Sequence, residues 1–449
     1  MSYISSSHIN PISYGQEYPE SYWSKTIDEI PDDDGNAPFQ QDTEVAIIGG
    51  GYTGLSCAYH LAHNHGINAV VLEANRPGWG CSGRNGGFAR MALGRYSASD
   101  MLQKWGPKMA NELFQQCVSS LNLVKTLIKE GQIECDALEA GHLKIAHRKS
   151  RVDALRNEAT ILQKIFKYPA QFIEAKDLNQ NYLGGSQSFG ALQIPDAISL
   201  HPLKLSLGML KMARNAGAIV YSNSPVLEIN KKNEQYSLTT LHGKLNAKIV
   251  VIATNGYTPE ALSPTLTDTL LPVLSHIIVT RPLTNHELKS SGFLTQHLLT
   301  DTRNLLYYWR LLPDNRILFG GRGQISDRKQ THQKQKIFLL SELIRKYPSL
   351  KDVTVEYDWH GWVCVTRDYL PHIYHAKNDR TLLYGLGYQG SGVSMSLYAG
   401  KLLANSIESN ILNAIPPTHT PLKPYPLHSL IRIPQAVAYQ WYKFLDNKD

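Results

Sequence analysis

The sequence has few cysteines, and their arrangement excludes two common ways of stabilising a fold. Only five cysteines occur in 449 residues, at positions 57, 81, 117, 135 and 364. Their number is odd and their spacing is wide, which argues against both a disulfide framework and a cysteine-based zinc site. We therefore expect reduced thiols. No other grouping with metal-ligand spacing stands out either, so the sequence predicts no metal site.

Long hydrophobic runs are also absent. The longest apolar runs, such as residues 249–253 (IVVIA), have the length of a strand and not that of a membrane-spanning helix. The first forty residues lack a basic start followed by an apolar core, so they do not resemble a secretory signal. We therefore expect a protein without a membrane span, and the cytoplasm is the default location.

The charge is neither large nor concentrated. The formal net charge of +7 is small for this length and is spread along the chain, so no nucleic-acid partner is predicted. No catalytic triad or carboxylate pair emerges from the spacing of the polar residues. With 42% hydrophobic residues, the chain can bury a large core and should form about two or three domains.

The most informative stretch that is present is residues 45–54 (VAIIGGGYTG). It reads as a buried strand that enters a glycine-rich turn and then a helix, which is how proteins hold the phosphates of a dinucleotide. Gly49 permits the tight turn, Gly51 lets the backbone approach the pyrophosphate, and Gly54 lets the helix pack closely on the strand. The helix offers unpaired amides to the phosphates, and Gly66 is its expected end.

A second strand and an acidic residue complete this unit. Residues 67–72 form an apolar run, and Glu73 follows it about 20 residues after the last glycine of the turn, where a carboxylate accepts hydrogen bonds from ribose hydroxyls. A solvated surface glutamate is the alternative. The order of strand, turn, helix, strand and acid favours nucleotide binding.

Two kinds of segment favour a flavin over a nicotinamide. Residues 78–87 (GWGCSGRNGG) contain glycine at positions where it costs folding entropy, which is tolerated where backbone passes close to a ligand; a generic surface loop is the alternative. Residues 249–256 (IVVIATNG) and 382–393 (LLYGLGYQGSGV) are two further strands that end in small-residue turns, and a helical pattern follows the second. A nicotinamide dehydrogenase would leave the Arg84 segment and the late glycine turn without a purpose.

These motifs carry a family resemblance that spans nearly the whole chain. The sequence resembles the D-amino-acid oxidase superfamily of FAD-dependent oxidoreductases, and within it the branch that includes gamma-glutamylputrescine oxidoreductase. The similar segments are residues 20–23 (ESYW), 81–87 (CSGRNGG), 141–143 (GHL), 251–257 (VIATNGY), 305–310 (LLYYWR), 316–321 (RILFGG) and 387–393 (GYQGSGV). The nucleotide and flavin motifs are specific to the superfamily, and the branch is assigned by overall similarity.

The resemblance implies which residues hold FAD. At the adenosine end they are Gly49, Gly51, Gly54 and Glu73, with Val226 near the adenine; near the flavin and pyrophosphate they are Ser82, Arg84, Asn85, Gly86 and Gly87; over the ring they are Gly390, Gly392 and Val393. Some relatives tether the flavin through a cysteine shortly before a Thr-Pro-Asp motif. Here the corresponding position is Gly361, before Thr366. We therefore predict noncovalent FAD, with Cys364 an ordinary strand residue.

The resemblance also implies the fold class, which is α/β. A Rossmann-like FAD-binding domain is interleaved with an α+β substrate domain built on a large, mainly antiparallel sheet. The expected segments are an N-terminal extension (1–39), three parts of the FAD-binding domain (40–134, 197–260 and 360–415), two parts of the substrate domain (135–196 and 261–359), and a C-terminal tail with a short helix (416–449).

The substrate pocket should lie between that sheet and the flavin ring. Tyr308, Arg310 and His360 are the candidates for it. If residues 305–311 form a strand, Tyr307 and Tyr308 point to opposite faces, and Arg310 shares a face with Tyr308. Arg310 is suited to bind a substrate carboxylate, with a structural salt bridge as the alternative; for His360, packing with a hydrogen bond is the alternative. For His142, as for His360, the two interpretations are a place in the substrate pocket and packing with a hydrogen bond.

The absence of a conventional catalytic group fits a reaction whose difficult step belongs to the cofactor. We expect oxidation of an amine C–N bond by hydride transfer to the flavin N5, hydrolysis of the resulting imine, and reoxidation by O2 or another electron acceptor. The resemblance implies gamma-glutamylputrescine or a similar amine in polyamine catabolism. The alternatives are an oxidase or dehydrogenase of another amino acid or N-methyl amine, and, more remotely, a flavin-dependent RNA-modification or partner-binding domain. The oligomeric state is not readable from the sequence.

Overall fold

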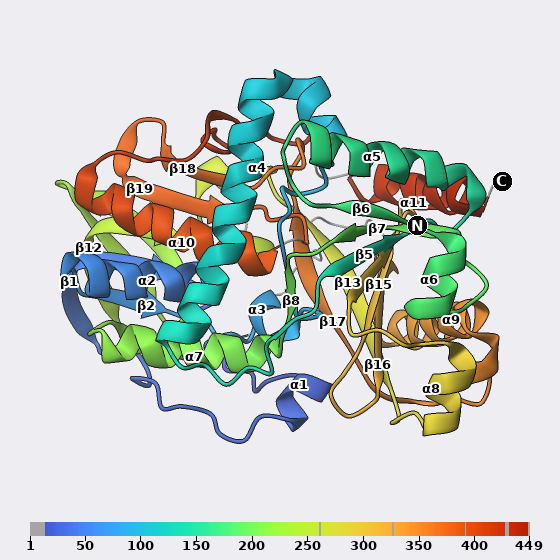
Figure 1. Ribbon diagram of the computed structural model, residues 1–449. Coiled ribbons are helices and arrows are strands. Elements are labelled where there is room, and N and C mark those ends of the chain that lie inside the picture. Colours follow the sequence, from blue (N-terminus) through green and yellow to red (C-terminus); the bar gives the residue numbers. More distant parts are fainter. Residues whose placement is uncertain (1–13, 260–261, 326, 391, 427–430, 448–449) are drawn as a thin grey trace.

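A computed structural model describes residues 14–259, 262–325, 327–390, 392–426 and 431–447. Parts of the expected N-terminal extension (1–13) and C-terminal tail (427–430 and 448–449) lie outside the described residues. The chain folds around two large sheets that stand side by side, with the long helix α4 (Ala98–Glu130) crossing between them (Figure 1). Among the described helices, none combines the length and the apolar character needed to cross a membrane.

The first sheet is the expected nucleotide-binding sheet. Its parallel strands stand in the order β19 (Asp379–Leu386), β12 (Lys244–Ile252), β1 (Gln40–Ile48), β2 (Ala69–Leu72) and β9 (Ile219–Tyr221). Three strands extend it with antiparallel pairs: β10 (Val226–Lys232) and β11 (Gln235–Thr240) continue from β12, and β18 (His372–Ala376) pairs with β19.

Alternating side chains of β1 show why both faces of this sheet are covered. Val45 and Ile47 pack into the cluster that contains α2 (Tyr52–His65), α7 (Pro202–Asn215) and α10 (Gly392–Ser409). Ala46 and Ile48 pack on the opposite side with apolar residues of the 262–270 segment. Because successive side chains of a strand point to opposite faces, a continuous apolar run is the pattern that such a strand requires.

The second sheet is the large, mainly antiparallel one. Its order is β17 (Val355–Val365), β13 (Leu271–Thr280), β16 (Ile317–Gln324), β15 (Tyr307–Leu311), β14 (Leu298–Asp301), β5 (His142–Ile145), β7 (Gly190–Ile194) and β6 (Gln171–Glu174), and only the β14–β5 pair is parallel. A small third sheet, β3 (Phe88–Arg90), β8 (Ala197–Ser199) and β4 (Leu138–Glu139), connects segments of the two halves. The expected domain boundary between residues 359 and 360 falls inside β17.

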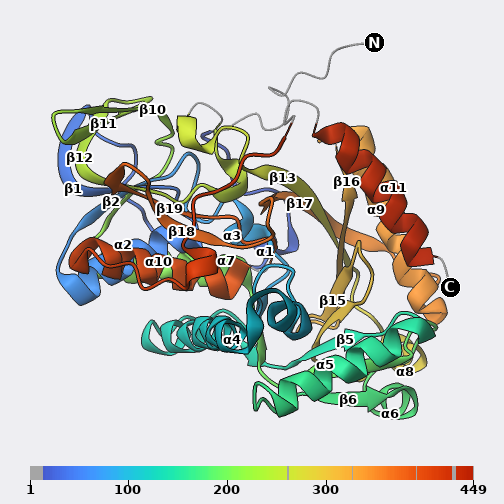
Figure 2. The same ribbon diagram turned by 90° about the horizontal axis from the view of Figure 1, so that it is seen from above.

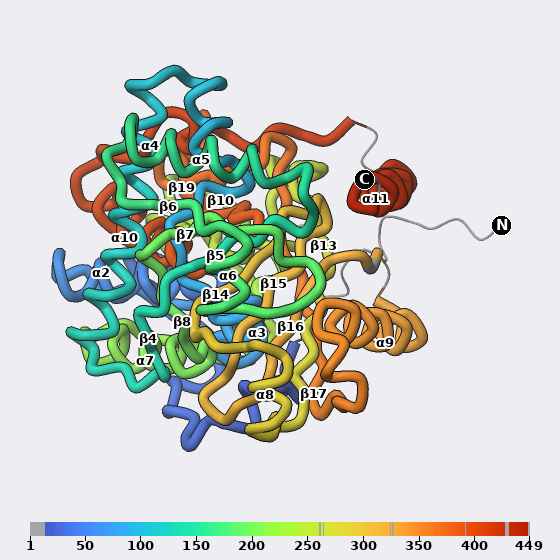
Figure 3. Tube along the Cα trace, turned by 45° about the vertical axis from the view of Figure 1, so that its right-hand side comes forward, coloured from blue at the N-terminus to red at the C-terminus, as the bar shows by residue number. Residues whose placement is uncertain are grey.

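Helices cover the outside of the second sheet. Helix α9 (Lys329–Lys346) packs on β13 and β16, and α11 (Arg432–Asn447) lies beside α9 (Figures 2 and 3). The remaining helices are α1 (Tyr22–Lys25), α3 (Cys81–Arg84), α5 (Val152–Lys164), α6 (Ala175–Asn181) and α8 (Asn285–Ser291). Only part of the α11 aromatic face packs on the body: Tyr439 is buried, whereas Trp441 and Phe444 are 56% and 54% exposed.

Candidate active site

A large cavity lies between the two sheets. It has a volume of about 760 Å³, within the range of small-molecule and cofactor sites. Eleven of the thirteen residues that the resemblance assigns to FAD line it: Gly49, Gly51, Glu73, Ser82, Arg84, Asn85, Gly86, Val226, Gly390, Gly392 and Val393. The structure therefore brings together segments that lie more than 300 residues apart in the sequence.

The glycines of the first turn are required by close backbone contacts. Gly49 has φ +108°, and its N–H donates to the carbonyl of Leu72 at 2.9 Å. Gly54 is one of the two assigned residues outside the cavity lining, and a Cβ there would lie 1.9 Å from the carbonyl oxygen of Gly49. Gly54 thus lets α2 approach β1, and it acts through packing. Helix α2 ends at Gly66, which is left-handed with φ +67°, as predicted.

Glu73 is held at the end of β2 by backbone amides. Its Oε2 accepts from the N–H of Gly50 at 2.7 Å, and its Oε1 accepts from the N–H of Asn75 at 3.0 Å. Burial raises the pKa of this carboxyl, and the two amides act in the opposite direction. A carboxylate has about four acceptor positions, so two remain for ribose hydroxyls in the cavity.

The segment 78–87 is an ordered loop around the single turn of α3. The Oγ of Ser82 accepts from the N–H of Tyr52 at 2.9 Å, which ties the loop to the start of α2. Asn85 folds the loop on itself: its Nδ2 donates to the carbonyls of Cys81 and Ser82, and its Oδ1 accepts from Gly87 at 2.8 Å. Gly87, the second assigned residue outside the lining, has φ +73° and packs on the Leu200 carbonyl.

Arg84 lies over the ring of Trp79 at the cavity wall. Its guanidinium carbon is 3.8 Å from the ring centroid of Trp79, and its Nε donates to the Trp79 carbonyl at 2.7 Å. Its Nη2 is buried and has no hydrogen-bond partner among the described residues. Burying a donor without a partner is costly, so this position suits a ligand that brings an acceptor.

The late glycine turn closes the opposite end of the cavity. The N–H of Gly387 donates to the Asn255 side chain at 2.9 Å, which links the loop to the turn after β12. Gly390 has φ +90°, a conformation that favours glycine, and a Cβ there would lie 2.6 Å from Nη2 of Arg322. Helix α10 begins at Gly392 and places the positive end of its dipole at the cavity.

These residues fit FAD. The cavity connects a phosphate-binding turn and a ribose-binding carboxylate at one end with a glycine loop and a helix N-terminus at the other, and an orphaned guanidinium donor lies between them. When bound, FAD supplies the acceptor for two electrons from the substrate.

Of the three predicted substrate residues, Tyr308 alone lines the cavity. Its hydroxyl lies 2.9 Å from Oγ of Ser275, and burial raises its pKa to about 12, so the phenol stays protonated at neutral pH. Gly320, on the neighbouring strand β16, gives it space, because a Cβ there would lie 2.2 Å from the tyrosine ring. Tyr307 packs into the core on the other face, as the strand pattern predicts.

Arg310 has a positioning role in place of the predicted carboxylate contact. It shares the Tyr308 face, but its Nε donates to the Gly86 carbonyl at 3.0 Å and its Nη2 to the Leu200 carbonyl at 2.7 Å. The guanidinium therefore holds the loop of residues 78–87, here called the flavin-side loop, in place. The sequence suggested a carboxylate or a salt bridge as its partner, and backbone carbonyls take that place.

The structure does not bring the His360 side chain to the cavity. Gly361 and Val363 line the cavity, so the alternation along β17 turns His360 to the opposite face, towards α9. There its ring stacks on His332 with the centroids 3.9 Å apart. Only its backbone carbonyl faces the flavin-side loop, where it accepts from Arg84 Nη1 at 3.4 Å.

Sequence reasoning missed two partly buried arginines of the cavity wall, Arg90 and Arg322. Arg322 donates from Nη2 to the carbonyl of Gln389 at 2.7 Å, and burial lowers its pKa. Arg90 lies 3.4 Å from Nε2 of His142, and burial lowers its pKa to about 10. Among the described residues, no carboxylate pairs with either one. In the sequence, Arg90 comes shortly after the glycine-rich segment 78–87, and Arg322 directly follows two glycines of a strand. This closeness to glycines was the signal that could have identified both as cavity residues.

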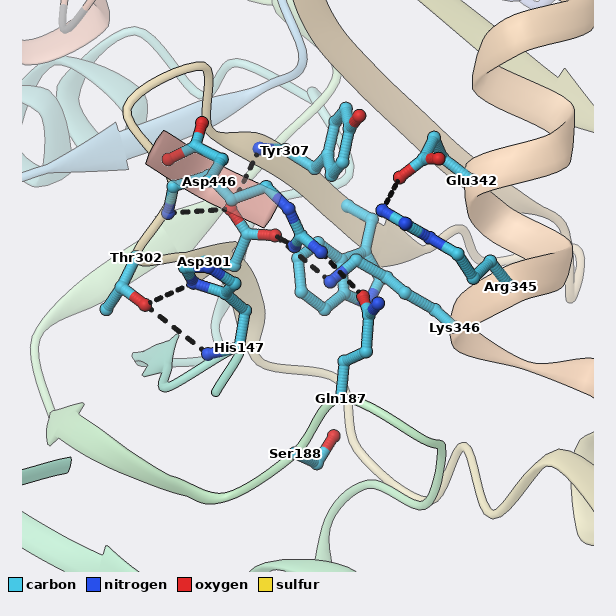
Figure 4. Close-up of polar contacts among 12 residues, drawn as sticks. His147, Gln187, Ser188, Asp301, Thr302, Tyr307, Glu342, Arg345, Lys346 and Asp446 are labelled. Carbon is cyan, nitrogen blue, oxygen red and sulfur yellow. Dashed lines mark hydrogen bonds and ion pairs between the residues drawn. The ribbon is translucent and has the colours of Figure 1, made fainter. Parts of the chain in front are cut away.

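A buried charge network supports the wall next to this pocket (Figure 4). Asp301 contacts Arg303, lies 3.0 Å from Nζ of Lys346, and accepts from the N–H of Tyr307 at 3.0 Å. Burial alone would raise the pKa of Asp301, but the two cations keep it below its usual value. Asp446 of α11 accepts from three donors of residues 304–305, so the C-terminal helix holds the segment that directly follows Arg303.

Comparison with known proteins agrees with this site. The model of the family "DAO: FAD dependent oxidoreductase" matches residues 44–406. Gamma-glutamylputrescine oxidoreductase of Escherichia coli (strain K12) is 29% identical over 438 residues, covering 96% of this chain and 99% of that protein. The probable oxidoreductase OrdL of Rhizobium meliloti (strain 1021) is 30% identical over 397 residues, covering 88% of this chain and 89% of that protein.

Solved structures share the fold. Glycine oxidase from Geobacillus kaustophilus superposes with a TM-score of 0.72 at 22% identity, covering 86% of this chain and all of that one. L-proline dehydrogenase from P. horikoshii superposes with a TM-score of 0.69 at 20% identity, covering 85% and 96%. The predicted resemblance and fold class are confirmed, and the chain belongs to the DAO family of FAD-dependent oxidoreductases.

Proposed function

We propose that this FAD-dependent amine or amino-acid oxidoreductase oxidises gamma-glutamylputrescine or a similar amine that carries a carboxylate far from the reacting C–N bond. The observation that carries the proposal is Arg90, a partly buried cation of the cavity wall that no described carboxylate neutralises. Isolated buried charges are costly, so such a group is expected to meet its counter-charge in the ligand.

The surroundings of Arg90 suit the head group of an amino acid. Lys144 and Glu158 line the same part of the cavity, and the charge of Glu158 acts on Lys144. A glutamyl head brings one carboxylate and one ammonium, which match a cationic and an anionic wall group respectively. His142 has a pKa well below its usual value, because of burial and the Arg90 charge, and stays neutral. It therefore adds a hydrogen-bonding group without competing for the carboxylate.

The other end of the pocket suits an amine in its neutral form. Tyr308 and Ser275 are neutral there, and Arg322 is a cation beside Gly390. A nearby positive charge disfavours a protonated amine, so the pocket favours the unprotonated form that can lose a hydride from its α-carbon. The products would be an imine, hydrolysed by water to an aldehyde and an amine or ammonia, and two electrons that pass by way of FAD to O2 or another acceptor.

We further propose that FAD is bound noncovalently, as the sequence predicts. Gly361 occupies the place of the tethering cysteine of some relatives, and Cys364 is buried in the core. Cys81 does line the cavity, but its thiol donates to the Trp362 carbonyl, and burial raises its pKa to about 11. The thiolate is the reactive form of cysteine, so a neutral thiol is a poor nucleophile for flavin attachment.

A second candidate is an amino-acid or N-methyl-amine oxidase. Arg322 favours it, because this cation lies beside the glycine loop at the ring end, where a small substrate would place its carboxylate. The two candidates differ in the distance between the carboxylate and the reacting amine.

The experiment is an anaerobic titration of the purified flavoprotein, followed by its visible spectrum. Reduction by gamma-glutamylputrescine, with little reduction by sarcosine, glycine or proline at equal concentration, supports the first candidate. Reduction by the small amino acids instead supports the second. Failure of all of these amines to bleach the flavin would refute both. Readmission of O2 with measurement of hydrogen peroxide then identifies the acceptor.

A further inference from the structure

Three histidines from three different elements meet on the outer face of the second sheet. His276 of β13 and His360 of β17 are directly opposite each other in the antiparallel pairing, and both side chains point away from the cavity. Helix α9 covers this face and adds His332. One ligand nitrogen from each of the three lies within 4.8 Å of the others.

Two carboxylates surround the histidines. The Oδ1 of Asp327 lies 2.6 Å from Nε2 of His332 and 3.1 Å from Nε2 of His360, so one oxygen is shared between two imidazoles. The Oδ2 of Asp358 lies 3.4 Å from Nε2 of His276. Asp327 can thus provide a fourth ligand, and Asp358 can orient His276 as the outer carboxylate of many metal-bound histidines does.

A cluster of histidines held only by hydrogen bonds does not account for the environment of His276. Its side chain is 1% exposed, and neither ring nitrogen makes a hydrogen bond within the part of the chain that the structure describes. The Asp358 contact lies at the outer distance limit for a hydrogen bond. Buried polar groups are nearly always paired, so an unsatisfied buried imidazole calls for a partner.

From this geometry we infer that His276, His332, His360 and Asp327 form a binding site for a zinc-type divalent transition-metal ion. Imidazole nitrogen with one carboxylate oxygen suits Zn²⁺, Co²⁺ and their neighbours, whereas Mg²⁺ and Ca²⁺ prefer oxygen ligands. A tetrahedral site with bonds of about 2.0–2.1 Å separates its ligand atoms by roughly 3.3 Å, so side-chain rotations must close the present spacing by about 1.5 Å.

The backbone around the three histidines is fixed by strand pairing and by an ion pair. The β13–β17 pairing runs from Leu271 to Thr280, and the Nζ of Lys336 on α9 lies 2.7 Å from Oδ1 of Asp358. His332 and His360 are partly exposed, which leaves an entry path for the ion. Because the opposite face of the same strands lines the cavity, the bound ion would fix α9 to the wall without contacting the substrate.

The test uses tag-free, EDTA-treated flavoprotein of full length. Equilibrium dialysis with Zn²⁺ should give one equivalent per chain, and Co²⁺ should give the visible absorption bands of tetrahedral coordination. Zn²⁺ should also raise the Tm, since an ion that binds only the folded state stabilises it by mass action.

Two ligand variants and one control decide the assignment. His332→Ala and His360→Ala should each weaken binding by more than about 100-fold, the upper end of the effect of removing an outer partner of a metal ligand. Both positions are partly exposed, and circular dichroism checks that the variants fold. His242→Ala, in an exposed turn, should bind as the parent does. Absence of a stoichiometric equivalent, or its retention in either ligand variant, overturns the inference. Neither result depends on the substrate proposed above.

Discussion

Replacing Arg90 by methionine tests the proposed anchor for the substrate carboxylate. The side chain is partly buried at the cavity wall, with Nη1 3.4 Å from Nε2 of His142, and no described carboxylate pairs with it. Because burial lowers its pKa only to about 10, the guanidinium remains charged at neutral pH. Methionine keeps an unbranched side chain of similar bulk but removes the charge and every donor.

The magnitude follows from the loss of a buried charge pair. Removing one partner of such a pair costs roughly 2–5 kcal/mol, which corresponds to about 30- to 4,000-fold in binding. The carboxylate lies far from the reacting bond and makes the same contact in the ground state and the transition state. We therefore expect KM for gamma-glutamylputrescine to rise by this factor, with little change in kcat.

The assay measures flavin reduction by stopped-flow spectroscopy with two substrates. Putrescine lacks the carboxylate, so its rate should be unaffected by Arg90→Met, and the preference for the glutamylated amine should disappear. Arg95→Met is the matched control, because Arg95 also lines the cavity but is exposed to solvent. An equal loss for both substrates would show that Arg90 is structural, and unchanged kinetics would refute the anchor. Without substrate, the variant should unfold at the parental Tm or higher, since a partly buried charge that lacks a carboxylate partner has been removed.

Three further outcomes are expected. Arg310→Met leaves two buried carbonyls without their donor, at about 1–3 kcal/mol each, so the Tm should fall and FAD should be lost more readily during dialysis; unchanged FAD retention would contradict its positioning role. Acid precipitation should release the yellow chromophore into the supernatant, and a coloured pellet would refute noncovalent binding. Burial alone would raise the pKa of Asp379, but hydrogen bonds from groups that include Lys231 and Tyr236 lower it to about 2. A carboxyl whose pKa is lower in the folded protein than in the unfolded chain stabilises the fold at pH values above its unfolded pKa. This contribution is lost as the pH falls through the folded-state pKa. The free energy of unfolding measured in urea should therefore fall between about pH 4 and pH 2. This fall should be smaller in Asp379→Asn.

The cofactor half of the site is predictable from sequence because its requirements are local. Gly54 must be glycine because the carbonyl of Gly49, five residues earlier, occupies the space of a Cβ. Such contacts arise within one strand-turn-helix unit and leave a fixed spacing in the sequence. The same holds for the end of α2 at Gly66, where a left-handed residue is needed.

The substrate half is not predictable in the same way, because it depends on pairing between distant strands. Arg310 and Arg322 lie on neighbouring strands of one sheet; Arg310 is buried and Arg322 is partly buried. Which backbone carbonyl each guanidinium meets is decided by the loop that crosses above it, and Arg322 also lines the cavity whereas Arg310 does not. The 78–87 loop reaches Arg310, whereas the turn at residues 387–390 reaches Arg322. No spacing within β15 or β16 encodes that difference.

The β13–β17 pair shows how strand parity divides one stretch of sequence between two sites. Ser275 and Gly361 face the cavity, and their neighbours His276 and His360 face α9. A histidine in this stretch looks like a candidate for catalysis as long as the direction of alternation is unknown. Once the direction is fixed, the same side chain is excluded from the pocket and becomes part of a cluster that only the tertiary fold assembles. The chemistry near the ring is then left to neutral hydroxyls, an arginine without a carboxylate partner among the described residues, and the cofactor. This is the composition expected where the protein orients an amine and the flavin accepts its electrons.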